Sequence, residues 1–229
     1  MADAATAGGA PVRRTQAERR AGTVRRLLDA TTAALVEIGY YRTTVAEICA
    51  RAGLSQGALF RHFETRIALL IAVAEDIDTG LRALYRSDFE RLRPTQPDEL
   101  VLAVAVLRAN IASPLHQAWF ELLMAARTDG ALHAALLPMW QRRAEDDQAL
   151  AAQLLPEQAR QLPDFAVLVD TMVTLFHGEG VDRFLRHDPA AESRRMTWLI
   201  ERLRPLLEPS AASSTGKPAA AAQETETSA

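Results

Sequence analysis

The stretch GLSQGALFRHF, residues 53–63, contains the pattern that decides the fold. Leu59 and Phe63 are four residues apart, so on a helix they share one face and point toward a core. The opposite face carries three side chains and one glycine that a partner could contact: Gln56, Gly57, Phe60 and Arg61. A plain surface helix is one interpretation. The other is a short helix, capped by Ser55, that buries one face and offers the other to a partner.

The preceding residues favour the second interpretation. TVAE, from Thr44 to Glu47, reads as a capping box, and an apolar stripe follows it up to Ala52. Only Gly53 to Ser55 remain to turn the chain. Two short helices joined by a glycine-containing turn form a helix-turn-helix, whose second helix lies in the DNA major groove. Cys49 belongs to the stripe, and we expect it to pack rather than to sense redox state.

Helical periodicity dominates the rest of the chain. An apolar stripe from Val24 to Ile38 is closed by Gly39, and another helix begins near Arg66. Pro138 should kink its helix or mark the first turn. Further helices are predicted over residues 98–112, 115–127, 131–153, 164–187 and 190–207. Because no segment alternates with period two, the sequence predicts an all-α protein.

Charge divides unevenly along the 229 residues. Residues 1–66 hold ten arginines and six acidic residues, whereas the remaining 163 residues hold 16 basic and 23 acidic ones. This basic head suggests a polyanion at one end, with chance clustering as the alternative. The lone cysteine excludes an internal disulfide and fits a cytoplasmic protein. No apolar run reaches the ~18 residues of a membrane span, and no secretion signal is recognisable.

Residues 25–70, RRLLDATTAALVEIGYYRTTVAEICARAGLSQGALFRHFETRIALL, resemble the signature of the tetracycline-repressor (TetR) family of bacterial regulators. Order and spacing match without insertion. The resemblance implies an N-terminal three-helix helix-turn-helix domain, residues 15–66, joined to a larger helical ligand-binding and dimerisation domain, residues 67–208. We expect disorder in the arm 1–14 and in the low-complexity tail 209–229.

The resemblance also implies a set of DNA contacts. Gln56 and Arg61 suit base edges, and Gly57 lets the backbone approach DNA closely. Phe60 replaces the commoner tyrosine and so loses one phosphate hydrogen bond. Tyr40 should mostly pack, with its hydroxyl as a possible phosphate contact. Arg13 and Arg14 either form a minor-groove arm or lack order. The predicted DNA-binding residues are Arg42, Thr43, Thr44, Ser55, Gln56, Gly57, Phe60, Arg61, His62 and Arg66, with Thr44, His62 and Arg66 assigned to phosphates.

Large apolar side chains are frequent in the second domain. Such residues are more often core than pocket, but the resemblance implies a small-molecule site among them. Its predicted lining is His116, Trp119, Phe120, Met124, Trp140, Met172 and Phe176. Further polar candidates are Gln117, Glu121, His133, Asp170 and His177. Few charges occur in this lining, so we expect an apolar or aromatic effector with one or two polar groups.

The last two helices are expected to form half of a four-helix dimer bundle, again by resemblance. Gly178 and Gly180 either permit close helix approach or break the helix. The predicted interface residues are Leu168, Leu175, Met196, Leu199, Ile200 and Leu203. A homodimer also suits the function, because two helix-turn-helix units reading a palindromic operator multiply specificity.

Catalytic motifs are missing from the sequence. It has no HExxH, GxSxG, phosphate loop or Cys/His metal cluster, so we expect neither an enzyme nor a cofactor or metal. The leading hypothesis is a dimeric, ligand-responsive transcription repressor. The competing hypothesis is a constitutive or protein-regulated DNA-binding architectural factor whose second domain has no ligand.

Overall fold

The computed structural model describes residues 15–155 and 157–207, and all regular secondary structure in these ranges is helical. The all-α prediction is therefore confirmed. The expected arm with Arg13 and Arg14, and the expected C-terminal tail, lie outside the described residues. No single described helix is long and apolar enough to cross a membrane, although two consecutive helices, Glu99–Ile111 and Pro114–Ala126, pass that test jointly with a 66° bend.

Three helices form the N-terminal domain: α1 (Gln16–Ile38), α2 (Val45–Ala52) and α3 (Gln56–Phe60). Gly39 and Gly53 end the first two at positive φ, 77° and 62°, which glycine adopts without strain. Thr44 and Ser55 cap α2 and α3 as predicted. Only half of the predicted capping box forms, because the Glu47 carboxylate accepts from Arg51 instead.

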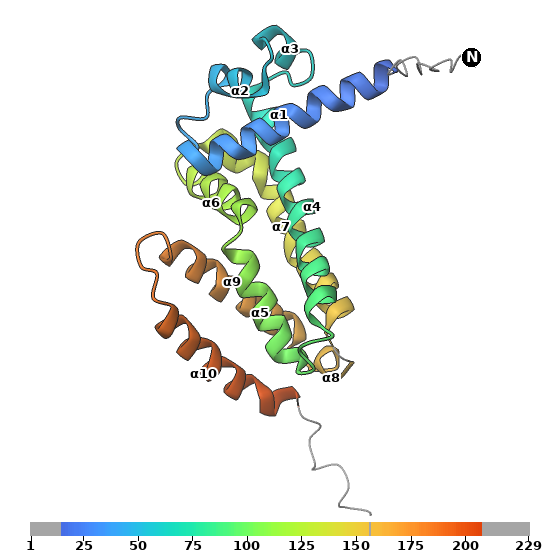
Figure 1. The fold of residues 1–229 in the computed structure, drawn as a ribbon, viewed down its shortest axis with the longest axis vertical. Coiled ribbons are helices and arrows are strands. Elements are labelled where there is room, and N and C mark those ends of the chain that lie inside the picture. The colour runs from blue at the N-terminus through green and yellow to red at the C-terminus, as the bar shows by residue number, and fades with distance from the viewer. Residues whose placement is uncertain (1–14, 156, 208–229) are drawn as a thin grey trace, which may run out of the picture.

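Helix α4 (Arg66–Leu92) joins the two ends of the molecule. It starts beside the N-terminal helices and runs along the body (Figure 1). Its first residue was predicted correctly. One face is completely buried in the core through Leu69, Leu70, Val73, Ala74, Ile77 and Leu81. A single rigid element therefore connects the helix-turn-helix to the second domain.

The body contains α5 (Glu99–Ile111), α6 (Pro114–Ala126), α7 (Gly130–Leu154), the short α8 (Glu157–Arg160), α9 (Phe165–Asp182) and α10 (Pro189–Leu207). Figure 1 shows α4, α5 and α7 running along the body, with α9 and α10 beyond α5. Pro138 lies inside α7, which continues past it. Helix α9 ends five residues before the predicted end at 187, and Gly178 and Gly180 do not break it.

Gly180 permits the closest approach between α9 and its neighbours. A Cβ atom there would lie 2.7 Å from a Phe120 ring carbon and 2.8 Å from Ile111. Real Cβ atoms do not approach so closely, so only glycine fits this position. A Cβ atom at Gly178 would meet nothing within 4 Å. The close-approach interpretation therefore holds for Gly180 within the subunit.

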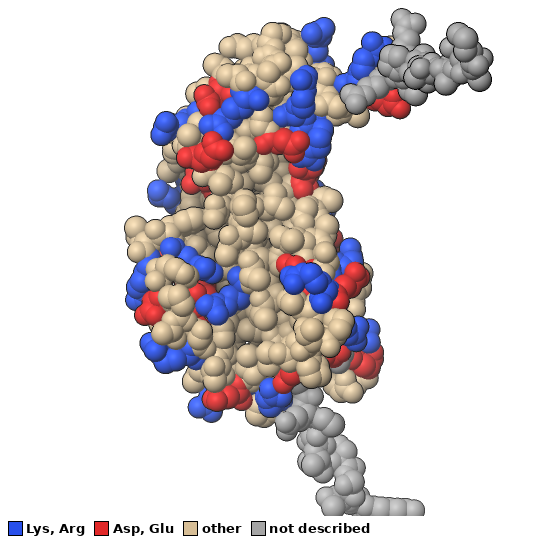
Figure 2. All heavy atoms as spheres, viewed as in Figure 1, with Lys and Arg blue, Asp and Glu red and all other residues tan. Residues whose placement is uncertain are grey.

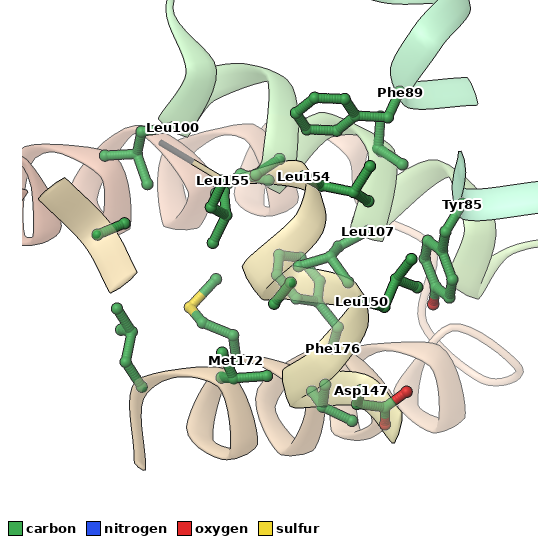
Figure 3. Close-up of a pocket in the computed structure, with 18 of the residues that line it drawn as sticks. Tyr85, Phe89, Leu100, Leu107, Asp147, Leu150, Leu154, Leu155, Met172 and Phe176 are labelled. Carbon is green, nitrogen blue, oxygen red and sulfur yellow. The ribbon is translucent and has the colours of Figure 1, made fainter. Parts of the chain in front are cut away.

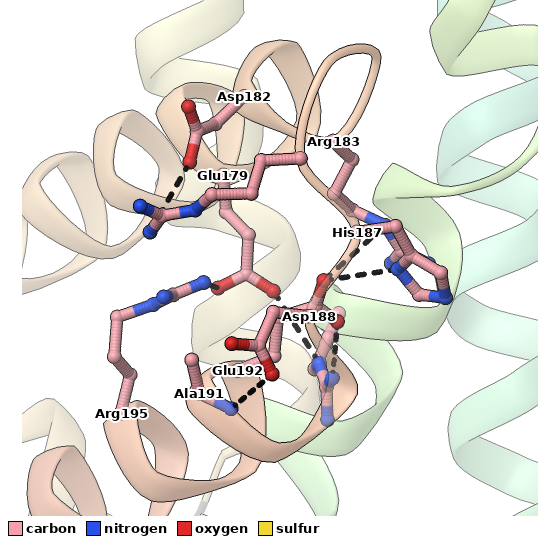
Figure 4. Close-up of polar contacts among 10 residues, drawn as sticks. Glu179, Asp182, Arg183, His187, Asp188, Ala191, Glu192 and Arg195 are labelled. Carbon is pink, nitrogen blue, oxygen red and sulfur yellow. Dashed lines mark hydrogen bonds and ion pairs between the residues drawn. The ribbon is translucent and has the colours of Figure 1, made fainter.

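Buried ion pairs hold α10 against α5 and α9 (Figure 4). Glu192 of α10 is 1% exposed and accepts from Arg108 of α5, with 2.5 Å between Nη2 and Oε2. Glu179 of α9 lies 3.4 Å from both Arg108 and Arg195. His187 contacts the other Glu192 oxygen at 3.1 Å. Because both carboxylates are buried and both pair with Arg108, removing Arg108 would weaken the charge compensation of both at once.

Candidate functional site

The outer face of α3 is available for a partner. Ser55, Gln56, Gly57 and Arg61 are exposed, and Phe60 is 46% exposed, while Leu59 beneath them is completely buried. A Cβ atom at Gly57 would meet nothing within 4 Å, so packing inside the protein does not require glycine there. Figure 2 shows basic side chains interspersed with acidic ones at the α1–α3 end of one face, above a largely uncharged band. This geometry suits a recognition helix.

The start of α2 presents a second part of this face. Arg42 and Thr44 are exposed, and the first amides of a helix favour phosphate. Thr43 differs, because its side chain is completely buried and its hydroxyl donates to the Gly39 carbonyl at 2.8 Å. This burial does not fit a DNA contact by the Thr43 side chain. His62 is half-buried, and its Nδ1 atom is buried without a hydrogen-bond partner among the described residues.

Arg66 is directed into the protein rather than toward the DNA face. Its Nε donates to the Thr43 carbonyl at 3.1 Å and its Nη2 to the Tyr40 carbonyl at 2.9 Å. The guanidinium also lies 4.3 Å from the centre of the Tyr40 ring. The predicted phosphate contact does not fit this conformation. Motif position suggested an exposed cation, whereas the side chain folds back to fix the loop between α1 and α2.

Tyr40 connects that loop to the second domain. Its backbone N–H donates to Glu121 of α6 at 2.9 Å, and its hydroxyl donates to Asp129 at 2.6 Å. Asp129 also caps α7 by accepting from the Leu132 amide. Burial, together with the bond to Asp129, raises the pKa of Tyr40. The Tyr40 hydroxyl is thus used inside the protein and does not face a phosphate.

A cavity of about 140 Å³ lies between α4, α5, α7 and α9 (Figure 3). Four of its lining side chains are polar: Tyr85, Arg143, Asp147 and His177. The others are apolar and include Phe89, Leu107, Leu150, Leu154, Met172 and Phe176. Such a space, with a few convergent polar groups, has the character of a small-molecule site.

The predicted lining is only partly right. Met172 and Phe176 line the cavity, and so does His177 from the further polar candidates. His116, Trp119 and Phe120 are buried in the core outside it, and Met124 and Trp140 are 53% and 42% exposed. These five residues do not line this cavity. The two tryptophans stack on each other with ring centres 6.1 Å apart, so their size serves packing.

One end of the cavity is charged. Buried Arg143 pairs with Asp78 at 2.6 Å, while its Nε has no hydrogen-bond acceptor among the described residues. Asp147 lies 3.5 Å from that Nε, and burial raises the Asp147 pKa. Burial and the charge of Arg143 lower the pKa of His177 to about 4, so this imidazole is neutral at pH 7.

Sequence reasoning missed Arg143 and Asp147. A signal existed, because both residues fall on the same helical stripe as Leu150 and Leu154, with spacings of four, three and four. Charged residues on an apolar stripe indicate a buried polar site. Neither contributes to a metal site, since the described residues contain no group of three His, Cys, Asp or Glu side chains that could hold an ion.

The predicted dimer residues mostly face their own subunit. Met196 is buried, Leu199 and Ile200 pack against the core, and Leu168 and Leu203 line the cavity. Leu175 remains 42% exposed. It belongs to an exposed face of α9 that we call the α9 stripe, made of Val167, Thr171, Leu175 and Val181.

Comparisons with known proteins agree with this architecture. The family described as "Bacterial regulatory proteins, tetR family" matches residues 27–73. An uncharacterised HTH-type transcriptional regulator of Mycobacterium tuberculosis is 35% identical over 191 residues, covering 81% of this chain and 95% of the relative. SCO4454, a TetR-family transcriptional regulator from Streptomyces coelicolor, shares the fold with a TM-score of 0.60 at 23% identity, covering 82% and 97% of the two chains.

A further solved structure is the multidrug binding protein EbrR complexed with imidazole. It has a TM-score of 0.57 and 18% identity, and the alignment covers 82% of this chain and 97% of that one. Its likeness shows the fold alone. The extended relationship to the mycobacterial regulator goes further, because it spans both domains at 35% identity. The chain therefore belongs to the TetR family and is a DNA-binding transcriptional regulator rather than an enzyme.

Proposed function

We propose that the protein is a cytoplasmic, dimeric repressor that a small apolar or aromatic effector releases from a palindromic operator. The observation that carries this proposal is the path of α4. Its first residue, Arg66, holds the loop next to the DNA-binding helices, and its Tyr85 and Phe89 line the cavity. A ligand that moves α4 would therefore move the recognition helix.

The DNA contacts follow from the exposed residues of α2 and α3. Gln56 and Arg61 read base edges, because Gln suits adenine and Arg suits guanine. The same face exposes Ser55, Gly57 and Phe60. In the proposed complex these three residues approach the DNA backbone. Arg42 and Thr44 contact phosphates beside the first turn of α2, and His62 reaches a phosphate from the end of α3. Phosphate contacts position the protein, and the base contacts supply specificity.

Dimerisation supplies the second recognition helix. The α9 stripe exposes Val167 to 63% and Leu175 to 42%, and apolar area of this kind favours a protein partner. A second copy packed on this stripe would pair two helix-turn-helix units. One unit buries too little surface for selectivity, whereas two successive major grooves provide it.

Effector release follows from differential affinity. The effector must bind better to the conformation in which the two recognition helices no longer fit successive grooves. The largely apolar cavity supports a ligand of matching character. EbrR, which shares the fold, holds a small ligand, imidazole, in its solved complex.

The test has two stages. Selection from a pool of random duplexes should enrich a palindrome, and sedimentation should show two chains per site. A panel of single-ring aromatic compounds is then screened for a rise in melting temperature and for release of the selected duplex. If the palindrome is found but no compound binds, the constitutive or protein-regulated architectural factor becomes the better description.

A further inference from the structure

We propose that the cavity selects an effector whose head group is neutral and both donates and accepts hydrogen bonds, a hydroxyl or a carboxamide, on a single-ring hydrophobic body. This inference rests on the proposed function, because it specifies the ligand of the same cavity. It concerns the polar end, where Arg143 of α7 and Asp147 one turn later face the space.

The size of the body follows from the size of the cavity. Its volume is about 140 Å³, and its walls are apolar over most of their area. Apolar cavities of ~150 Å³ accept benzene. A substituted benzene ring therefore fits with little rearrangement, whereas a sugar or a nucleotide would lack partners for its many polar groups.

The head group follows from two incomplete contacts. The Nε atom of Arg143 is a buried donor with no acceptor among the described residues. The nearest Asp147 oxygen is 3.5 Å away, too far for a good hydrogen bond. A ligand hydroxyl beside the two can accept from Nε and donate to the carboxylate, which satisfies both groups with one atom.

Charged head groups fit less well. A ligand carboxylate could accept from Nε but would lie against the carboxylate of Asp147, with Asp78 beyond it on Arg143. A ligand ammonium could donate to Asp147 but would be repelled by Arg143 and has no lone pair for Nε. Tyr85 and His177, the other polar groups of the lining, add no compensating charge. The oppositely charged Arg143 and Asp147 together favour a neutral ligand that is a donor and an acceptor.

A matched set of ligands tests this inference on the full-length protein. The probes are 4-butylbenzyl alcohol, 4-butylbenzamide, 4-butylbenzoate and 4-butylbenzylamine, with butylbenzene as the hydrocarbon reference. Calorimetric titration gives each dissociation constant. The alcohol and the amide should bind about 10- to 100-fold more tightly than the acid and the amine, the range expected for hydrogen bonds to charged groups.

Variants assign the selectivity to Asp147. Asp147→Leu removes the acceptor and should weaken alcohol binding by about tenfold relative to butylbenzene. Asp147→Asn removes the negative charge and should reduce the preference for the alcohol over the benzoate by about tenfold relative to wild type. Asp146→Asn is the matched control, because Asp146 is a neighbouring carboxylate that pairs with Arg82 and does not line the cavity. It should keep the wild-type order of affinities.

The outcomes separate the inference from the proposed function. If all five probes bind with similar affinity, or if the acid or the amine binds most tightly, the cavity is a ligand site without the proposed selectivity. If Asp146→Asn changes the order as much as Asp147→Asn, the effect is general electrostatics and the inference fails. If none of the probes binds, the proposed effector site is wrong and the inference fails with it.

Discussion

The Tyr40 hydroxyl donates a hydrogen bond to Asp129 at 2.6 Å, which joins the loop after α1 to the N-cap of α7. The same α7 lines the cavity farther along, with Arg143, Asp147 and Leu150. The DNA-binding domain is therefore attached to the cavity wall by a second route besides α4. This hydrogen bond joins the buried Tyr40 side chain to Asp129, the residue that caps α7. A movement of α7 should therefore also shift the loop at the end of α1.

Removing this bond should weaken effector control. Tyr40→Phe keeps the ring and its packing, but Asp129 and Arg66 lose a partner. We expect DNA affinity without effector to stay within about threefold, and the effector-induced loss of DNA affinity to fall by several-fold, since coupling energies are ~1–3 kcal/mol. Fluorescence anisotropy with labelled duplex, with and without effector, measures both.

Tyr41→Phe is the comparison variant, because the Tyr41 hydroxyl contacts Thr128 at 2.6 Å from an exposed position. Its effect on coupling should be smaller, since an exposed contact exchanges readily with water. Unaltered coupling in Tyr40→Phe would mean that α4 alone carries the signal.

If α3 reads bases, variants of its base-contacting residues should discriminate less well between the selected duplex and a scrambled one. Arg61→Ala and Gln56→Ala should each weaken binding to the selected duplex by ~1–3 kcal/mol while binding to a scrambled duplex changes little. Arg142→Ala is a suitable control, because Arg142 is an exposed arginine on α7. Equal losses on both duplexes would show that Arg61 and Gln56 contact phosphates instead of bases.

Local signals in the sequence predicted the N-terminal helices well. Gly39, Thr44 and Ser55 end or begin helices as expected, because caps depend on the residue and its immediate neighbours. Side-chain direction was harder to predict. Thr43 and Arg66 both turn inward, since each finds a backbone partner in the loop after α1. Motif position alone carries no information about such contacts.

The cavity could not be located from residue type alone. Trp119 and Met172 are both large and apolar, yet one packs in the core and the other lines the cavity. Which of them faces a void depends on the relative rotation of four helices, which no single helical stripe determines. The same limit applies to the prediction of the dimer interface. The more strongly apolar stripe of α10 packs within its own subunit, whereas the less apolar α9 stripe stays exposed.

The α9 stripe predicts where a charge will disrupt the dimer. Leu175→Glu places a carboxylate in the proposed interface, where pairing would bury it without a partner, so we expect monomers in sedimentation. The monomer itself should stay folded, because Leu175 is exposed. Leu137→Glu on α7 is the matched control at nearly equal exposure, 41% against 42%, and should stay dimeric. Dimers in both variants would place the interface elsewhere.

Glu192 predicts a pH-dependent part of stability. Burial alone would raise its pKa, but the bonds from Arg108 and His187 and the charges of nearby arginines outweigh burial and hold the pKa below its ordinary 4.5. Its folded-state pKa is therefore below its unfolded value. The stabilisation is fully present above the unfolded pKa and is lost as pH falls through the folded pKa.

Glu192→Gln should accordingly lower the free energy of unfolding by ~3 kcal/mol at pH 7, because it neutralises the closer of the two buried carboxylates that pair with Arg108. The difference from wild type should shrink as pH falls below about 4.5. Urea unfolding at several pH values measures it. Glu201→Gln, an exposed glutamate on the same helix, should change stability by less than ~0.5 kcal/mol. A Glu192→Gln effect that does not vary with pH would contradict the ionic role.

In the proposed function, occupation of the cavity controls DNA binding. The most direct measurement titrates the selected duplex with wild-type protein while 4-butylbenzyl alcohol is held at a concentration that calorimetry shows to be saturating. DNA affinity should then fall at least about tenfold, a coupling of ~1.4 kcal/mol. If the alcohol is bound and DNA affinity stays unchanged, the cavity is not coupled to the helix-turn-helix and does not control DNA binding.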